Sequence, residues 1–83
     1  PDYEEEVLNR FVNRSAASYR RKLADEIERA LGDAERTNKL GGKPGVIRYL
    51  RAKYLGKIRS KLVNAGFTGE LASRTARRIV SEE

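Results

Sequence analysis

Apolar residues recur at spacings of three and four along the first 36 residues, which is the spacing of one face of an α-helix. The first stripe consists of Tyr3, Val7, Leu8, Phe11 and Val12. The second consists of Ala16, Tyr19, Leu23, Ile27, Ala30, Leu31 and Ala34. At about 100° per residue the two stripes are rotated by roughly 130°, so one straight helix could not bury both against one surface.

A break is therefore expected near residues 13–15, where short polar side chains compete for backbone hydrogen bonds. This predicts one helix near residues 3–13 and another near residues 16–36. The alternative is that the first two helices are one continuous, kinked helix.

Three glycines and a proline within five residues predict a loop over residues 37–45. Pro44 suits the first turn of a third helix, because its missing N–H has no helical partner there, and that helix is expected over residues 45–65. Gly66 is placed to end it in a left-handed conformation, and Thr68 to cap a fourth helix over residues 69–81. The predicted fold is all-α, a small four-helix bundle forming a single helical domain over the 83 residues.

The third helix is expected to have two uncharged faces. The first carries Ile47, Leu50, Tyr54, Ile58, Leu62 and Ala65. The second carries Ala52, Gly56 and Ser60 beside Tyr49 and Val63. Glycine inside a helix costs about 1 kcal/mol relative to alanine, so Gly56 indicates a closely packed neighbour. Another helix of the same bundle is favoured over a partner subunit or a nucleic-acid backbone. In the partner case Ala52, Gly56, Ser60 and Val63 would form the interface.

Basic residues outnumber acidic ones in the second half of the chain, with ten against three in residues 41–83 and eight against nine in residues 1–40. On the third helix they form two seams, Arg48 with Arg59 and Lys53 with Lys57 and Lys61. The fourth helix carries three arginines opposite its apolar stripe. The residues predicted to contact phosphates are Lys43, Arg48, Lys53, Lys57, Arg59, Lys61, Arg74, Arg77 and Arg78.

The start of the third helix is a second candidate for phosphate binding. Lys43, at the expected N-cap, has no side-chain acceptor, so the N–H groups of Gly45, Val46 and Ile47 would point outward unpaired. Helix N-termini of this kind bind anions. A solvated turn, with these groups bound to water, is the alternative.

The composition disfavours several function classes. The chain has no cysteine and no histidine, and its carboxylates show no catalytic spacing, so we expect no enzyme activity, no metal site and no cofactor. No apolar run approaches the roughly 20 residues of a membrane span, which favours a cytoplasmic protein without a membrane partner. The first residue is Pro1 rather than Met, which fits either a fragment of a larger protein or a start whose Met was removed.

The sequence therefore favours a small basic module that binds nucleic acid, DNA rather than RNA, through its phosphates and without strong sequence readout. The alternative is a protein-interaction or oligomerisation module of a larger assembly, homo-oligomeric or with another protein, based on the second uncharged face. Convergence of the nine basic residues on one face would favour nucleic-acid binding, whereas their scattering would favour a solubilising role.

Overall fold

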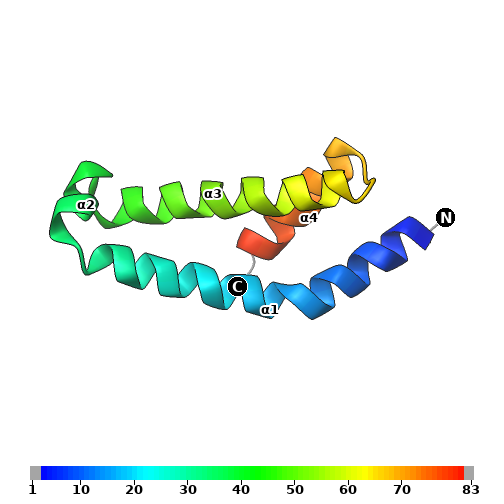
Figure 1. Cartoon of the computed structure of the whole chain (residues 1–83), viewed down its shortest axis with the longest axis horizontal. Coiled ribbons are helices and arrows are strands. Elements are labelled where there is room, and N and C mark those ends of the chain that lie inside the picture. Colours follow the sequence, from blue (N-terminus) through cyan, green and yellow to red (C-terminus); the bar gives the residue numbers. More distant parts are fainter. Residues whose placement is uncertain (1–2, 82–83) are drawn as a thin grey trace.

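The computed structural model describes residues 3–81, which form four α-helices and, within that range, no strand. These are α1 (Tyr3–Leu31), α2 (Ala34–Lys39), α3 (Gly42–Asn64) and α4 (Gly69–Ser81). Figure 1 shows α1 and α3 side by side and antiparallel, with α2 joining them at one end and α4 folding back against the pair. The all-α prediction is confirmed, although the bundle is extended, with principal dimensions of 48 × 21 × 17 Å.

The expected break near residues 13–15 is wrong, because α1 is one helix of 29 residues. The alternative of one bent helix is correct, and Figure 1 shows the bend in its N-terminal half. Asn9 and Arg20 bond to α4, whereas Glu26 bonds to α3. α1 therefore contacts both α4 and α3, and most residues of the two stripes are buried or half-buried without an interruption of the helix, although Tyr3 and Ala34 are exposed.

α1 ends earlier than expected, at Leu31, and a separate short helix follows. Asp33 caps α2, since its side-chain Oδ1 accepts a hydrogen bond of 3.2 Å from the Arg36 N–H. Thr37 holds α2 to the end of α1 by donating from Oγ1 to the Ala30 carbonyl at 2.9 Å. The loop predicted over residues 37–45 is therefore wrong, because seven of its nine residues are helical and only Leu40 and Gly41 form a turn between α2 and α3.

The corner between α2 and α3 depends on glycine. Gly41 and Gly42 have φ angles of 96° and 83°, which lie in the left-handed region that disfavours other residues. A Cβ atom on Gly45 would overlap the backbone carbonyl oxygen of Leu40. α3 therefore starts at Gly42, three residues earlier than expected, with Gly41 rather than Lys43 as its N-cap.

The predicted junction between α3 and α4 is confirmed. Gly66 has a φ of 109°, and its N–H donates to the Val63 carbonyl at 3.0 Å. The Phe67 N–H donates to the Leu62 carbonyl at 3.1 Å, which completes a Schellman motif. Thr68 then caps α4 by accepting from the Leu71 N–H at 3.2 Å.

The core face of α3 follows a strict spacing of four. Its buried apolar side chains are Val46, Leu50, Tyr54, Ile58 and Leu62. Four residues advance a helix by about 400°, so this stripe turns by about 40° per step and meets different neighbours along α3. Two members of the predicted face differ, because Ile47 is only half-buried beside the fully buried Val46 and Ala65 is exposed.

Candidate nucleic-acid interface

α4 packs against both α1 and α3 and covers one side of this helix pair. We call that side the covered flank and the opposite side the open flank. Asn9 and Arg20 of α1 bond to α4. At about 100° per residue, Tyr19 and Lys22 lie on the other side of the buried stripe of α1. α1 therefore presents different side chains on the two flanks.

On the covered flank, basic side chains hold the helices together. The Arg59 Nε donates to the Ser73 hydroxyl at 2.8 Å, and the Arg78 Nη1 donates to the Asn9 Oδ1 at 3.1 Å. The Arg20 Nε donates to the Ile79 carbonyl at 2.8 Å. Two of the nine predicted phosphate contacts, Arg59 and Arg78, are therefore engaged within the bundle.

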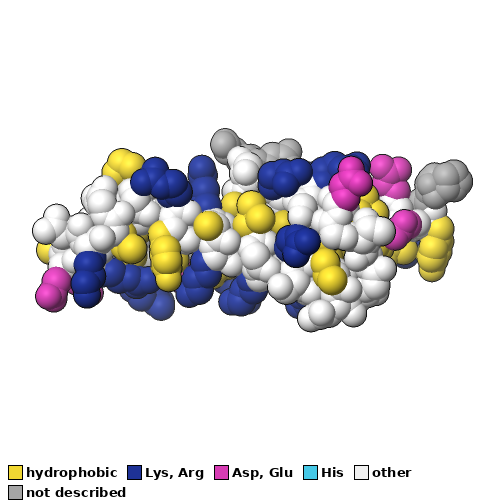
Figure 2. Space-filling view, turned by 90° about the horizontal axis from the view of Figure 1, so that it is seen from above, with side chains coloured by type: hydrophobic (Ala, Val, Ile, Leu, Met, Phe, Trp, Pro, Cys, Tyr) yellow, Lys and Arg dark blue, Asp and Glu magenta, His cyan; other side chains and the backbone are white. Residues whose placement is uncertain are grey.

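The arginines of α4 lie near acidic residues. Arg74 forms a weak ion pair with Glu70, at 3.9 Å between Nη2 and Oε2. Arg74 and Arg78 also line a shallow hollow together with Glu5 from the start of α1. Figure 2 shows acidic side chains beside basic ones at the end of the molecule where α1 begins. The neighbouring acidic side chains weaken the positive electrostatic potential of the three α4 arginines, although Arg77 is exposed.

The second uncharged face of α3 packs against no helix of the described bundle. Ala52, Gly56 and Ser60 are exposed, and a Cβ atom on Gly56 would meet nothing within 4 Å. Tyr49 and Val63 beside them remain 51% and 39% exposed. In Figure 2, basic side chains lie along both long edges of the molecule with mostly uncharged ones between. The expected bundle neighbour at Gly56 is therefore wrong, and the basic residues do not converge on one face.

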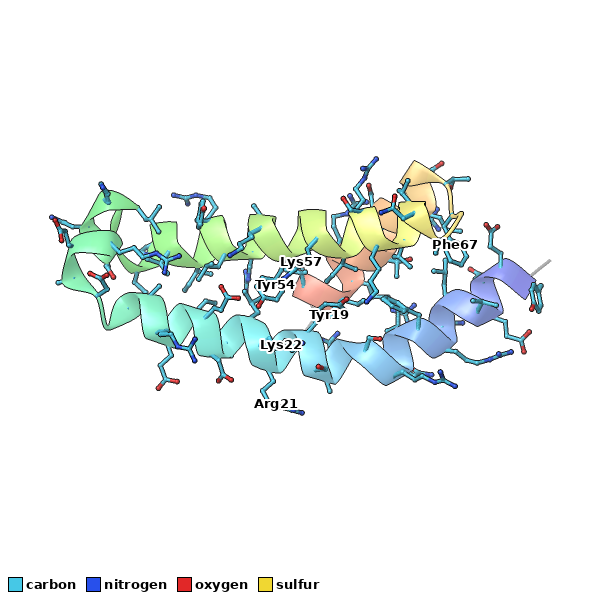
Figure 3. All side chains as sticks on the ribbon, viewed as in Figure 1. Tyr19, Arg21, Lys22, Tyr54, Lys57 and Phe67 are labelled. Carbon is cyan, nitrogen blue, oxygen red and sulfur yellow. The ribbon has the colours of Figure 1, made fainter. Side chains whose placement is uncertain are left out.

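One group of basic residues does converge, on a groove of about 470 Å³ between α1 and α3 on the open flank. Its lining residues are Tyr19, Lys22, Tyr54, Lys57, Ser60, Lys61 and Asn64. Among the described residues, none that lines the groove is acidic and none comes from α4. Figure 3 shows Tyr19, Tyr54 and Lys57 between the two helices, with Lys22 beside them on α1, whereas Arg21 points away from α3.

The floor of the groove is fixed by Tyr54, which is 3% exposed. Its hydroxyl donates to the Glu26 Oε2 at 2.5 Å. That hydrogen bond lowers the pKa of the Glu26 carboxyl, and burial raises the pKa of Tyr54 to about 12. Glu26 also attracts Lys53, whose Nζ lies 3.7 Å from its Oε1. Lys53, a predicted phosphate contact, is therefore partly neutralised.

Unlike Lys53, the three lysines that line the groove form no ion pair with another residue of the described range. Lys57 places its Nζ 5.3 Å from the centroid of the Tyr54 ring, a cation–π contact that leaves the ammonium exposed. Neither Lys22 nor Lys61 has a hydrogen bond or ion pair with any other residue in the described range 3–81. The groove is thus lined by three cations, of which Lys22 and Lys61 lack a carboxylate partner in this range, whereas Lys57 interacts electrostatically with Glu26.

Sequence reasoning found Lys57 and Lys61 but missed Lys22 and Tyr19. Both belong to α1, where basic and acidic residues alternate at spacings typical of local ion pairs. No local signal marks them, because their proximity to Lys61 depends on the antiparallel packing of two helices far apart in the sequence.

The predicted phosphate site at the start of α3 has a different structure. Gly45 and Val46 are buried and Ile47 is half-buried. Because α3 begins at Gly42, the N–H groups of Val46 and Ile47 lie inside the helix and face carbonyls one turn earlier. These groups do not point outward as expected. Lys43 and Arg48 are exposed nearby.

Within residues 3–81, no three His, Cys, Asp or Glu residues cluster so that they could hold a metal ion. None of the helices described there is both long enough and apolar enough to cross a membrane. No protein-family model, curated protein or solved structure matches the chain.

Proposed function

We propose that this protein binds nucleic acid through its phosphates, and that the binding site is the groove of the open flank. The observation that carries the proposal is the convergence of Lys22, Lys57 and Lys61, from two helices, on a groove without an acidic lining residue among those described. Ammonium groups that neutralise phosphates release condensed counterions, which drives association. Ser60 and Asn64 offer neutral hydrogen-bond donors for phosphate oxygens.

Of the nine predicted phosphate contacts, the proposed binding site retains Lys57 and Lys61, and it adds Lys22. The arginines of α3 and α4 act as a surrounding field that attracts the polyanion. DNA stays favoured over RNA, no base-specific readout is expected, and a cytoplasmic location is part of the proposal.

Charge reversal tests the site directly. Lys61→Glu should weaken binding of a labelled oligonucleotide about tenfold at low salt and reduce the log–log salt slope by about 0.7–0.9, the equivalent of one lost phosphate contact. Lys39→Glu on α2 is the matched control, because it changes the net charge equally at an exposed position outside the groove. Fluorescence anisotropy over a salt series provides both quantities.

The absence of any binding to single strands or duplex at low salt would refute the proposal. An equal loss in Lys39→Glu and Lys61→Glu would show that only net charge matters and that the groove is not the site. Circular dichroism of both variants establishes that the helices are intact.

A second candidate function is self-association through the outer face of α3. The specific observation is that a Cβ atom on Gly56 would meet nothing within 4 Å, while Tyr49 and Val63 beside it are 51% and 39% exposed. Gly56→Leu should leave the fold intact, because its side chain enters open space, but should disrupt a close helix–helix contact between subunits. Sedimentation of a monomer at high concentration, unchanged by Gly56→Leu, would contradict this candidate.

A further inference from the structure

The groove of the open flank continues along α1 as a longer channel. A neighbouring hollow shares Tyr19, Lys22 and Lys61 with the groove. The same hollow shares Arg14 and Ser15 with a third hollow, in the N-terminal half of α1. We call the three connected hollows the trough. From Val7 to Lys22 it follows α1 for about 22 Å, at 1.5 Å per residue.

Aromatic rings and basic side chains alternate along the trough. Phe11 and Tyr19 are both half-buried and pack against each other with 6.4 Å between ring centroids and 50° between ring planes. Arg14 lies between them in sequence and lines two of the hollows, and Lys22 follows one turn after Tyr19. Of the described residues that line the trough, none is acidic.

We propose that the trough binds single-stranded nucleic acid, with bases against Phe11 and Tyr19 and phosphates along Arg14, Lys22 and Lys61. This inference rests on the proposed function and specifies its ligand. A positively charged channel with aromatic side chains along it is the combination by which proteins hold unpaired strands without reading their sequence. At the 3.4 Å rise of one stacked strand, the trough along α1 would accommodate on the order of six nucleotides.

The aromatic lining favours a single strand over a duplex. In a duplex the faces of the bases are stacked on one another, so a ring at the protein surface gains no contact with them. An unpaired strand can place both its bases and its phosphates inside the trough.

The lining also disfavours an acidic helix as the occupant. A helix that docks in a groove needs apolar pockets for its anchor residues at spacings of three and four. Here the half-buried apolar side chains from α1 are separated by Arg14, Ser15 and Ser18, and on the opposite side of the groove by Ser60 and Lys61. These polar residues suit a ligand that is charged along its whole length.

Titrating the protein with a labelled oligothymidylate and with a duplex of equal length, at the same low salt, tests the inference. We expect the single strand to bind at least tenfold more tightly. Tyr19→Leu and Phe11→Leu retain the net charge and the apolar bulk but remove the ring, so each should weaken single-strand binding about tenfold and leave duplex binding unchanged. Tyr49→Leu, on the outer face of α3, is the matched control and should have no effect.

If the duplex binds as tightly as the single strand and the leucine variants match the wild type, the single-strand inference is wrong while the proposed function stands. If neither nucleic acid binds, the proposed function fails as well. Displacement of the strand by polyglutamate at equal charge concentration would overturn the inference in favour of an acidic protein partner.

A measurement on the unaltered protein removes the dependence on variants that could lose stability. In NMR titrations with the oligothymidylate, the ring protons of Phe11 and Tyr19 should shift in proportion to binding while those of Tyr49 stay fixed. Equal shifts of all three rings, or no shift of Phe11 and Tyr19 at saturation, would contradict base stacking in the trough.

Discussion

The covered and open flanks of the α1–α3 pair both carry basic side chains, but these side chains differ in their hydrogen-bond partners. On the covered flank, guanidinium groups reach acceptors on neighbouring helices, as Arg20 does at the Ile79 carbonyl and Arg59 at the Ser73 hydroxyl. On the open flank, Lys22 and Lys61 have no acceptor among residues 3–81. The same charge therefore stabilises the bundle on one flank and remains available to a ligand on the other.

The largest difference in stability should come from the apolar side chains beneath the covered flank. Ile79 of α4 is fully buried, so Ile79→Ala should lower the free energy of unfolding by about 3 kcal/mol through lost burial and a residual cavity. Val63→Ala, on the exposed outer face of α3, should change it by less than about 0.5 kcal/mol. Urea unfolding followed by circular dichroism measures both. Equal losses would mean that α4 is not an essential part of the core.

A smaller difference should separate two basic residues two positions apart on α1. Arg20→Ala removes the hydrogen bond to the Ile79 carbonyl and should cost about 1–2 kcal/mol of stability. Lys22→Ala should cost less than about 0.5 kcal/mol, yet weaken nucleic-acid binding more than Arg20→Ala does. Urea unfolding and fluorescence anisotropy on both variants measure stability and affinity. If a single variant showed both the larger loss of stability and the larger loss of affinity, the two flanks would not have separate roles.

The smallest effect concerns Tyr54, which joins α1 to α3 beneath the groove. Tyr54→Phe removes the hydrogen bond to Glu26 and should cost about 1 kcal/mol near neutral pH. The cost should shrink at both ends of the pH range, and unfolding free energies of the wild type and the variant over a pH series measure this. If the difference in unfolding free energy between the wild type and Tyr54→Phe did not depend on pH, the hydroxyl would stabilise the fold without Glu26.

The direction of this pH dependence follows from the pKa shifts of Glu26 and Tyr54. Because the pKa of Glu26 is lowered in the fold, its stabilisation is present above the unfolded-state pKa and is lost as the pH falls through the lowered folded value. Because the pKa of Tyr54 is raised to about 12, its stabilisation is present below its unfolded value and is lost as the pH rises through about 12.

The features of the fold that could be predicted from sequence are those with local causes. The end of α3 at Gly66 and the cap of α4 at Thr68 depend on residues within a few positions, and both are confirmed. The continuity of α1 was not predictable in this way. Its polar residues 13–15 would favour a break, but α1 is held to α4 on both sides of them, through Asn9 and Arg20, and to α3 further along, through Glu26, which supports an uninterrupted helix.

The candidate site was only half predictable, because its two sides come from distant parts of the chain. The lysines of α3 are visible as a basic seam, whereas Lys22 and Tyr19 lie in a helix of mixed charge and gain their role only from the packing of α1 against α3. The balance of charge within residues 1–40 concealed the fact that Arg14 and Lys22 share one side of α1.

Gly45 and Gly56 of α3 give a criterion by which relatives of this chain could be evaluated. Any descendant that keeps the corner between α2 and α3 should retain glycine at position 45, because the Leu40 carbonyl occupies the place of a side chain. Position 56 faces open space, so in a monomer other residues could replace its glycine without a steric clash. Retention of glycine at both positions across diverged sequences would indicate selection for a contact at the outer face of α3, whereas free variation at position 56 alone would argue that this face meets only solvent.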